Sequence, residues 1–167
     1  MSDLSNTGPV PLEHGQIIPA FTLPGTDNLP YSPWDYKQRA HLVLLFLRSS
    51  QDDFSRMLLR AFADRYKDFR EEQCALLAIT GDPVIRNMTA QETLHLPYPL
   101  LSDPQGTVIS RYTFWERASE HFHPCIVLAD RYNAVYHQWR ADNEANQLPP
   151  LTELLESLQY LNRLCTP

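Results

Sequence analysis

One uninterrupted apolar run, residues 42–47, constrains the fold of this 167-residue chain more than any other feature. Six consecutive apolar residues do not follow the spacing of an amphipathic helix or of a half-exposed strand. They suit a strand that is buried on both faces at the centre of a sheet. We therefore predict a central strand over 41–47. The run is much too short to cross a bilayer, so we expect no contact with a membrane.

Four further extended segments are predicted from the same kind of pattern. Residues 74–80 read as a second buried strand, which stops at a Gly-Asp-Pro sequence, and residues 98–103 form a short extended piece. Residues 125–129 and 134–139 are predicted to pair as antiparallel strands, because only the turn 130–133 separates them.

Apolar residues at helical spacing predict a long helix over 50–70. Ser50 followed three residues later by Asp53 resembles a capping box at its start, and the adjacent Asp52 suits the positive end of the helix dipole. Shorter helices are expected over 83–94 and 108–112, and an amphipathic helix over 151–164 closes the chain.

Residues 20–32 read as a short hairpin, and Ser32 followed by Pro33 marks the start of a helix of one or two turns. The order of elements, a β-α-β unit that leads to a hairpin and a terminal helix, predicts an α/β sandwich with a mixed sheet. We expect residues 1–13 to be loosely ordered and residues 14–167 to form one domain.

Charge and cysteine content exclude several classes of function. A net charge of −6 argues against a nucleic-acid partner, because phosphate binding needs a basic surface. Three widely spaced cysteines encode neither a disulfide framework nor a zinc ribbon. We expect no metal and no cofactor. The first residues carry no pattern of a targeting segment, so we expect a cytoplasmic protein.

Four segments carry a family resemblance in the right order. They are GQIIPAFTLPG at 15–25, SPWDY at 32–36, LLSDPQG at 100–106 and HPCIVLAD at 123–130. Together they resemble the peroxiredoxins, the alkyl hydroperoxide reductase and thiol-specific antioxidant branch of the thioredoxin-like fold. The resemblance covers about residues 14–165. It implies a thioredoxin-like three-layer sandwich, with a central mixed β-sheet flanked by helices and an N-terminal β-hairpin.

The resemblance breaks in the loop that would carry the chemistry. Peroxiredoxins have a P-x-x-x-T-x-x-C segment after the first central strand, and here Arg48 replaces the proline, Asp52 the threonine and Ser55 the cysteine. Peroxide reduction needs a thiolate that becomes a sulfenic acid, and a serine oxygen cannot be oxidised in this way. Asp52 would also disfavour an adjacent anion. The loop is therefore predicted to be a degenerate active site.

Cys125 is the thiol that could take over a redox role. It follows Pro124, which the resemblance places at the cis-proline of many thioredoxin-like proteins. In that geometry Cys125 would lie near the vacant corner beside Ser55. The competing interpretation, which we favour, is a small buried residue at the start of a strand, since free cysteines are commonly part of a core.

Other candidate residues have a structural interpretation that outweighs a functional one. Cys74 begins a strand at the opposite end of the sheet, and Cys165 has no evident partner. His121 and His123 could point the same way on a strand, but two ligands do not make a metal site. Ser55 lies inside a helix without the G-x-S-x-G turn of a hydrolase. Residues 112–115 could form an exposed aromatic surface for a partner or ligand.

These observations predict a peroxiredoxin-like protein without classical peroxidase activity and with a binding or regulatory role. The alternative is a thiol-dependent antioxidant oxidoreductase that reduces peroxides or disulfides through a relocated cysteine such as Cys125. The interactions left open are with a protein partner or with a second copy of the chain.

Overall fold

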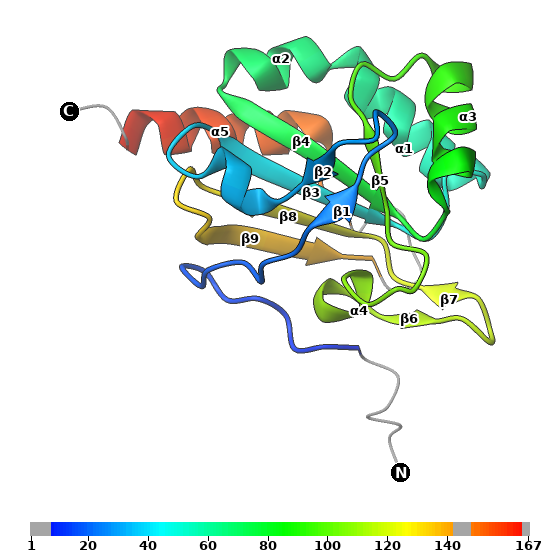
Figure 1. Cartoon of the computed structure of the whole chain (residues 1–167). Helices are drawn as coiled ribbons and strands as arrows, with labels where there is room; N and C mark the ends of the chain where they lie inside the picture. Colours follow the sequence, from blue (N-terminus) through cyan, green and yellow to red (C-terminus); the bar gives the residue numbers. More distant parts are fainter. Residues whose placement is uncertain (1–7, 142–147, 165–167) are drawn as a thin grey trace.

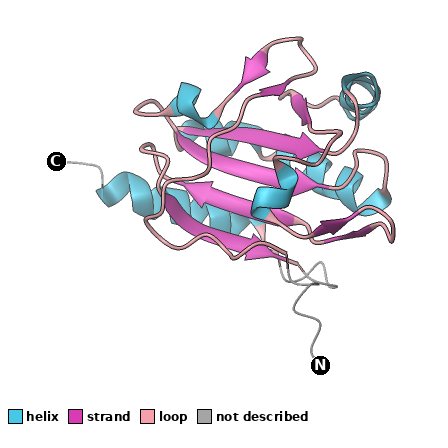
Figure 2. Cartoon of the chain, turned by 60° about the horizontal axis from the view of Figure 1, so that its bottom comes forward, coloured by secondary structure: helices cyan, strands magenta, loops and turns pink. Residues whose placement is uncertain are grey.

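A five-stranded mixed sheet forms the middle layer of the computed structural model, which describes residues 8–141 and 148–164 (Figures 1 and 2). The strand order is β5-β4-β3-β8-β9, in which β3, β4 and β5 are parallel, β8 runs antiparallel to β3, and β9 runs antiparallel to β8. The strands are β3 His41–Leu47, β4 Cys74–Thr80, β5 Leu100–Ser102, β8 Cys125–Ala129 and β9 Val135–Arg140.

The central strand β3 confirms the prediction from the apolar run. All seven of its residues are buried, and it pairs with β4 on one side and β8 on the other. The bounds of β4 and β8 also match their apolar segments. Sequences that are apolar at every position are stable only where both faces of a sheet are covered.

Helices cover one face of the sheet. They are α1 Asp53–Asp64, α2 Tyr66–Glu71, α3 Val84–Leu94 and α5 Leu151–Leu164. Their buried side chains, among them Leu59, Phe62, Phe69 and Leu158, pack with Val43, Leu45 and Leu47 of β3 in one core. This layer agrees with the predicted helices, apart from the break between α1 and α2.

The other face carries smaller elements, which complete a three-layer sandwich. They are the hairpin of β1 Leu23–Pro24 and β2 Pro30–Tyr31, the 3-10 helix η2 Pro33–Tyr36 and the helix α4 Ile109–Tyr112. Buried residues of these segments pack with Leu42, Leu44 and Phe46 of β3 in a second core. The predicted fold class, the N-terminal hairpin and the short helix after Ser32 are confirmed.

The helix predicted over 50–70 is wrong in one respect, because it is two helices. The backbone leaves helical geometry at Arg65, where φ is −108° and ψ is 8°. The Arg65 Nε donates to Asp68 Oδ2 at 2.6 Å in the first turn of α2. The break lets Phe69 pack beside Phe62, with ring centroids 5.5 Å apart.

A second hairpin, β6 Trp115–Glu116 with β7 His121–Phe122, was not predicted.

A buried histidine ties the start of β3 to the end of α5. His41 is fully buried, and its Nε2 lies 2.8 Å from Asn162 Oδ1. Burial lowers the pKa of His41, and the nearby Arg131 guanidinium lowers it further, whereas the hydrogen bond to Asn162 raises it. The lowering causes dominate, so the folded protein resists protonation at this position.

We therefore expect the free energy of unfolding to fall as the pH drops below about 6.5, the ordinary pKa of histidine in an unfolded chain. Below that pH the unfolded state binds a proton at His41 that the folded state does not bind. The contribution of neutral His41 to the free energy of unfolding is therefore complete above about pH 6.5 and is lost below it. Urea denaturation at pH 7.5, 6.5 and 5.5 checks this. The variant His41→Gln should show a weaker pH dependence, and an unchanged dependence would contradict the assignment.

Candidate functional site

The loop between β3 and α1 is held in place by hydrogen bonds to one buried carboxylate, that of Asp82. Asp82 Oδ2 accepts hydrogen bonds from Ser49 Oγ at 2.9 Å, Ser50 N at 2.7 Å and Ser50 Oγ at 2.8 Å. All three residues are buried. The prediction that Ser50 caps the helix is wrong, because its hydroxyl is directed to Asp82.

Asp52 caps α1 instead. Its Oδ1 accepts from Ser55 N at 2.8 Å, and its Oδ2 accepts from Ser55 Oγ at 3.0 Å. Arg48 Nη2 lies 3.7 Å from Asp52 Oδ2. The structure thus brings together three residues of the loop that was predicted to be a degenerate active site, Arg48, Asp52 and Ser55.

The environment of Ser55 is that of a residue held by the helix cap Asp52, and not that of a nucleophile. Its side chain is buried, with 2 % of the residue exposed, and its hydroxyl donates to the carboxylate of the preceding turn. A carboxylate at this distance opposes the development of negative charge on the Ser55 oxygen. The arrangement stabilises the first turn of α1 and does not activate the hydroxyl.

A cavity of about 240 Å³ lies beside this loop. Its lining residues come from the loop itself, the end of β4, the start of α3 and the β6–β7 hairpin, and they are Arg48, Ser49, Gly81, Asp82, Arg86, Trp115, Arg117 and Glu120. The indole of Trp115 lies against two glycines: a Cβ atom on Gly81 would meet Trp115 Cη2 at 2.3 Å, and one on Gly106 would meet Trp115 Cζ3 at 2.9 Å.

The structure does not place Pro124 and Cys125 as the resemblance implied. The described backbone contains no cis peptide bond, so the bond before Pro124 is trans. Cys125 pairs in register with Phe46 and belongs to the core opposite α1, whereas the buried face of α1 packs in the other core. The Cys125 side chain therefore points away from the face of the sheet that α1, with Ser55, covers.

Cys125 is fully buried, and burial raises the pKa of its thiol to about 12. Gln138 Nε2 donates to Cys125 Sγ at 3.2 Å and offsets part of that effect, as does Arg140. Cys74 is also buried, and burial raises the pKa of its thiol even more strongly. Cys165 lies outside the described residues.

The aromatic segment 112–115 is not an exposed surface. Tyr112 is fully buried, stacks on Phe46 with ring centroids 4.4 Å apart and donates its hydroxyl to the carbonyl of Pro19. Phe114 is buried as well, in mutual ring contact with His121 and His123. The histidine pair therefore packs against a phenylalanine, and no group of three metal-ligating side chains occurs among the described residues.

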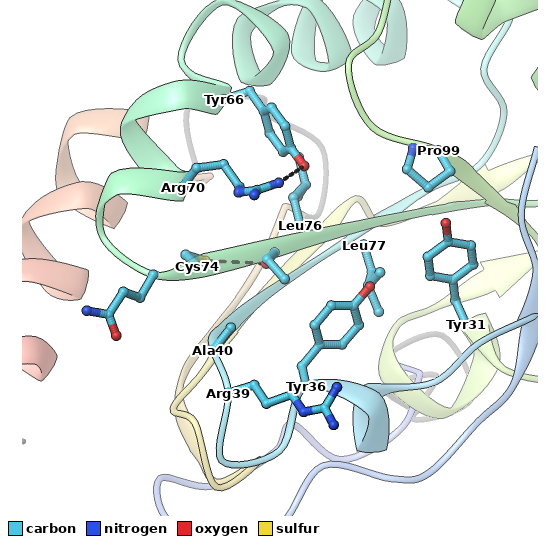
Figure 3. Close-up of a pocket in the computed structure, with 12 residues that line it drawn as sticks. Tyr31, Tyr36, Arg39, Ala40, Tyr66, Arg70, Cys74, Leu76, Leu77 and Pro99 are labelled. Atoms are coloured by element: carbon cyan, nitrogen blue, oxygen red, sulfur yellow. Dashed lines mark hydrogen bonds between the residues drawn. The ribbon is translucent and has the colours of Figure 1, made fainter. Parts of the chain in front are cut away.

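A larger hollow, of about 470 Å³, lies at the other end of the sheet, along the edge of β4 (Figure 3). Tyr31, Tyr36 and Tyr66 line it together with Arg39 and Arg70. No sequence motif indicates this site, because most of its residues come from four separate elements, β2, η2, α2 and β4. The one local signal was the spacing of Tyr66 and Arg70, which puts both side chains on one face of α2.

Comparisons with known proteins give a consistent picture. A family model described as the AhpC/TSA family matches residues 14–138. A protein of Mycobacterium tuberculosis (strain CDC 1551 / Oshkosh) that is named as a peroxiredoxin is 30% identical over 101 residues. That match covers 60% of this chain and 64% of the relative, so the chain spans less than two thirds of the relative's length.

Two solved structures share the fold. The peroxidoxin BcpB of Mycobacterium tuberculosis has a TM-score of 0.78 at 21% identity, with 89% of this chain and 97% of that chain covered. A cysteine-to-serine mutant of PrxQ from Xylella fastidiosa has a TM-score of 0.76 at 15% identity, with 94% of this chain and 99% of that chain covered.

None of the described helices combines the length and the apolar content needed to span a membrane.

Proposed function

Because the chain belongs to the AhpC/TSA family, we propose that it is a peroxiredoxin-like protein whose loop 48–55 no longer reduces peroxides and whose present role is binding or regulatory. The observation that carries this proposal is the state of Ser55. It is the residue that the family resemblance assigns to the reactive cysteine; its side chain is buried, and its hydroxyl donates to Asp52.

The source of the electrons in peroxide reduction explains why a serine at position 55 would prevent the reaction. A peroxide is reduced when a thiolate attacks one of its oxygens, so that the O–O bond breaks, the sulfur becomes a sulfenic acid and the other oxygen leaves as water or an alcohol. The sulfur supplies the two electrons. Ser55 has no sulfur to oxidise, and the neighbouring Asp52 would oppose an anion at this position.

A thiol oxidoreductase that uses Cys125 is the second candidate. The hydrogen bond from Gln138 Nε2 to Cys125 Sγ favours it, because donation to sulfur stabilises a thiolate. Burial acts in the opposite direction and is the larger effect on the pKa of this thiol. A buried thiol of this kind reacts slowly unless the fold opens.

We expect no consumption of hydrogen peroxide above the rate of the buffer when the protein is assayed with dithiothreitol or thioredoxin as reductant. The assay is run on the wild-type protein and on the variants Cys125→Ser and Cys165→Ser. Turnover that is lost only in Cys125→Ser would reject the proposal in favour of the second candidate. Turnover that is lost only in Cys165→Ser would reject both and assign the activity to that residue.

The proposal includes a cytoplasmic location and an interaction with a protein partner or with a second copy of the chain. A binding role needs a surface or cavity that is retained without the redox chemistry. The cavity of about 240 Å³ beside Arg48 and Trp115 and the hollow along β4 both meet that requirement.

A further inference from the structure

Half of strand β4 is an open edge. β5 pairs only with Ala78, Ile79 and Thr80, so within the described part of the chain no strand covers Cys74–Leu77 on that side. The Thr80 carbonyl accepts from Asp103 N on the β5 side, and alternate residues of a strand direct their backbone groups to the same side. The backbone N–H and C=O of Leu76 therefore point to this unpaired edge, which lies deep among the surrounding side chains, since Leu76 itself is only 4 % exposed.

Side chains from both faces of the sheet border this edge (Figure 3). Tyr66 and Arg70 extend from α2 on the face that the helices cover, and Arg70 Nη1 lies 3.5 Å from the Tyr66 hydroxyl. Tyr36 and Arg39, from the segment before β3, extend on the opposite face, together with Tyr31. The edge thus lies at the bottom of a groove that has one arginine on each side.

The groove is complementary to negative charge. Its lining contains two arginines and no carboxylate, in a chain whose net charge is −6. The nearby carboxylate of Asp27 accepts a hydrogen bond from the Tyr31 hydroxyl and is thus already engaged. The guanidinium groups of Arg39 and Arg70 are both on exposed residues and can reach a ligand without desolvation of a buried charge.

We propose that the open edge of β4 binds an extended peptide with two adjacent acidic residues as an added strand. Successive side chains of a strand point to opposite faces of a sheet, so adjacent acidic residues would face Arg70 on one side and Arg39 on the other. The peptide backbone would pair with Leu76, and the three tyrosines would flank its side chains. The proposal goes beyond the loss of peroxidase activity and does not depend on it.

The test uses a fluorescein-labelled, capped decapeptide with a central Glu-Asp pair between valines, titrated by fluorescence polarisation. We expect saturable binding, and binding at least about tenfold weaker for the same peptide with Lys-Lys at the centre, since two charge pairs are then reversed. N-methylation of the peptide amides that face β4 should abolish binding, and N-methylation of the alternate amides should not.

Protein variants locate the site. Arg39→Gln and Arg70→Gln should each weaken binding about threefold, and together about tenfold, as expected for exposed charge pairs. Arg60→Gln, an exposed arginine on α1 that does not line the groove, is the matched control. Amide hydrogen exchange of Leu76 should slow at least about tenfold when the acidic peptide saturates the protein.

Several results would overturn the proposal. One is the absence of saturable binding of the Glu-Asp peptide up to about 1 mM, and another is equal binding of the Lys-Lys peptide. If N-methylation has no effect, the groove takes carboxylates but not a strand. If Leu76 is protected without peptide in a concentration-dependent dimer, the edge pairs with a second copy. The peroxide assay is also run on the two arginine variants. Because Arg39 and Arg70 line the groove and do not belong to residues 48–55, the loss of peptide binding should leave the result of that assay unchanged. A failure of this proposal is thereby distinguished from a failure of the proposed function.

Discussion

The variant Asp82→Ala should unfold about 3 kcal/mol more easily than the wild-type protein in urea denaturation followed by circular dichroism. One oxygen of this buried carboxylate accepts three hydrogen bonds from Ser49 and Ser50. Removal of the carboxylate leaves these buried donors without an acceptor, and hydrogen bonds to a charged group contribute about 1.5–3 kcal/mol each.

Asp52→Ala is the matched control for Asp82→Ala, because it removes a carboxylate from the same loop. Asp52 is partly exposed and provides a helix cap, so we expect a loss of about 1 kcal/mol. Equal losses in the two variants would show that Asp82 does not hold the loop. A loss below that of Asp52→Ala would show that water replaces the carboxylate at Ser49 and Ser50.

The double variant Asp52→Thr/Ser55→Cys should react with iodoacetamide at pH 7 at least about threefold faster than the single variant Ser55→Cys. The thiol would lie in the first turn of α1, near Arg48, and both features favour a thiolate once the carboxylate of Asp52 is removed. Each tenfold gain in thiolate fraction is partly offset by lower nucleophilicity, which leaves about a threefold gain in rate. Threonine preserves a cap at position 52.

Both variants are compared in a Cys165→Ser background, in which the other thiols are the buried Cys74 and Cys125. We also expect the double variant to consume hydrogen peroxide faster than the single one. Equal alkylation rates would show that Asp52 does not control the charge at position 55. A faster single variant would show that Arg48 and Asp52 act as one neutral pair, and it would remove the physical reason for a degenerate loop.

The sequence predicted those parts of the fold in which local composition decides the structure. The runs at 41–47, 74–80 and 125–129 are apolar at nearly every position, and a strand covered on both faces accommodates such a pattern. The terminal helix over Leu151–Leu164 matched as well, because its leucines recur at helical spacing. The break at Arg65 was missed, because the pattern of buried residues continues through it to Phe69.

The sequence indicated which loop holds the candidate site but not the contacts made there. Arg48, Asp52 and Ser55 are close in sequence and contact one another in the structure. Asp82 contacts Ser50 across 32 residues, and no local pattern indicates which of two hydrogen-bonding roles Ser50 takes. The face of the sheet on which Cys125 lies depends on its register with Phe46, which a sequence without a partner strand does not give.

The groove along β4 was missed for a related reason. It exists because β5 is short, and the length of a pairing depends on where the chain between two strands turns away. Tyr31, Tyr36 and Tyr66 come from three separate elements, and each has an ordinary local role as a partly buried aromatic residue. Their convergence appears only once the topology is known.

The indole of Trp115, which lies against Gly81 and Gly106, limits how this end of the molecule can change during evolution. A side chain at either glycine would displace the ring, and Gly106 also has a φ of +72°, which favours glycine. These two turns and the β6–β7 hairpin are therefore constrained to vary together. The backbone at the start of the loop 48–55 shares this restriction, because a Cβ atom on Gly81 would also meet the Arg48 carbonyl oxygen at 2.9 Å. Changes in the chemistry of that loop that keep the framework are therefore exchanges of side chains, such as those at positions 52 and 55, and not changes in its backbone path.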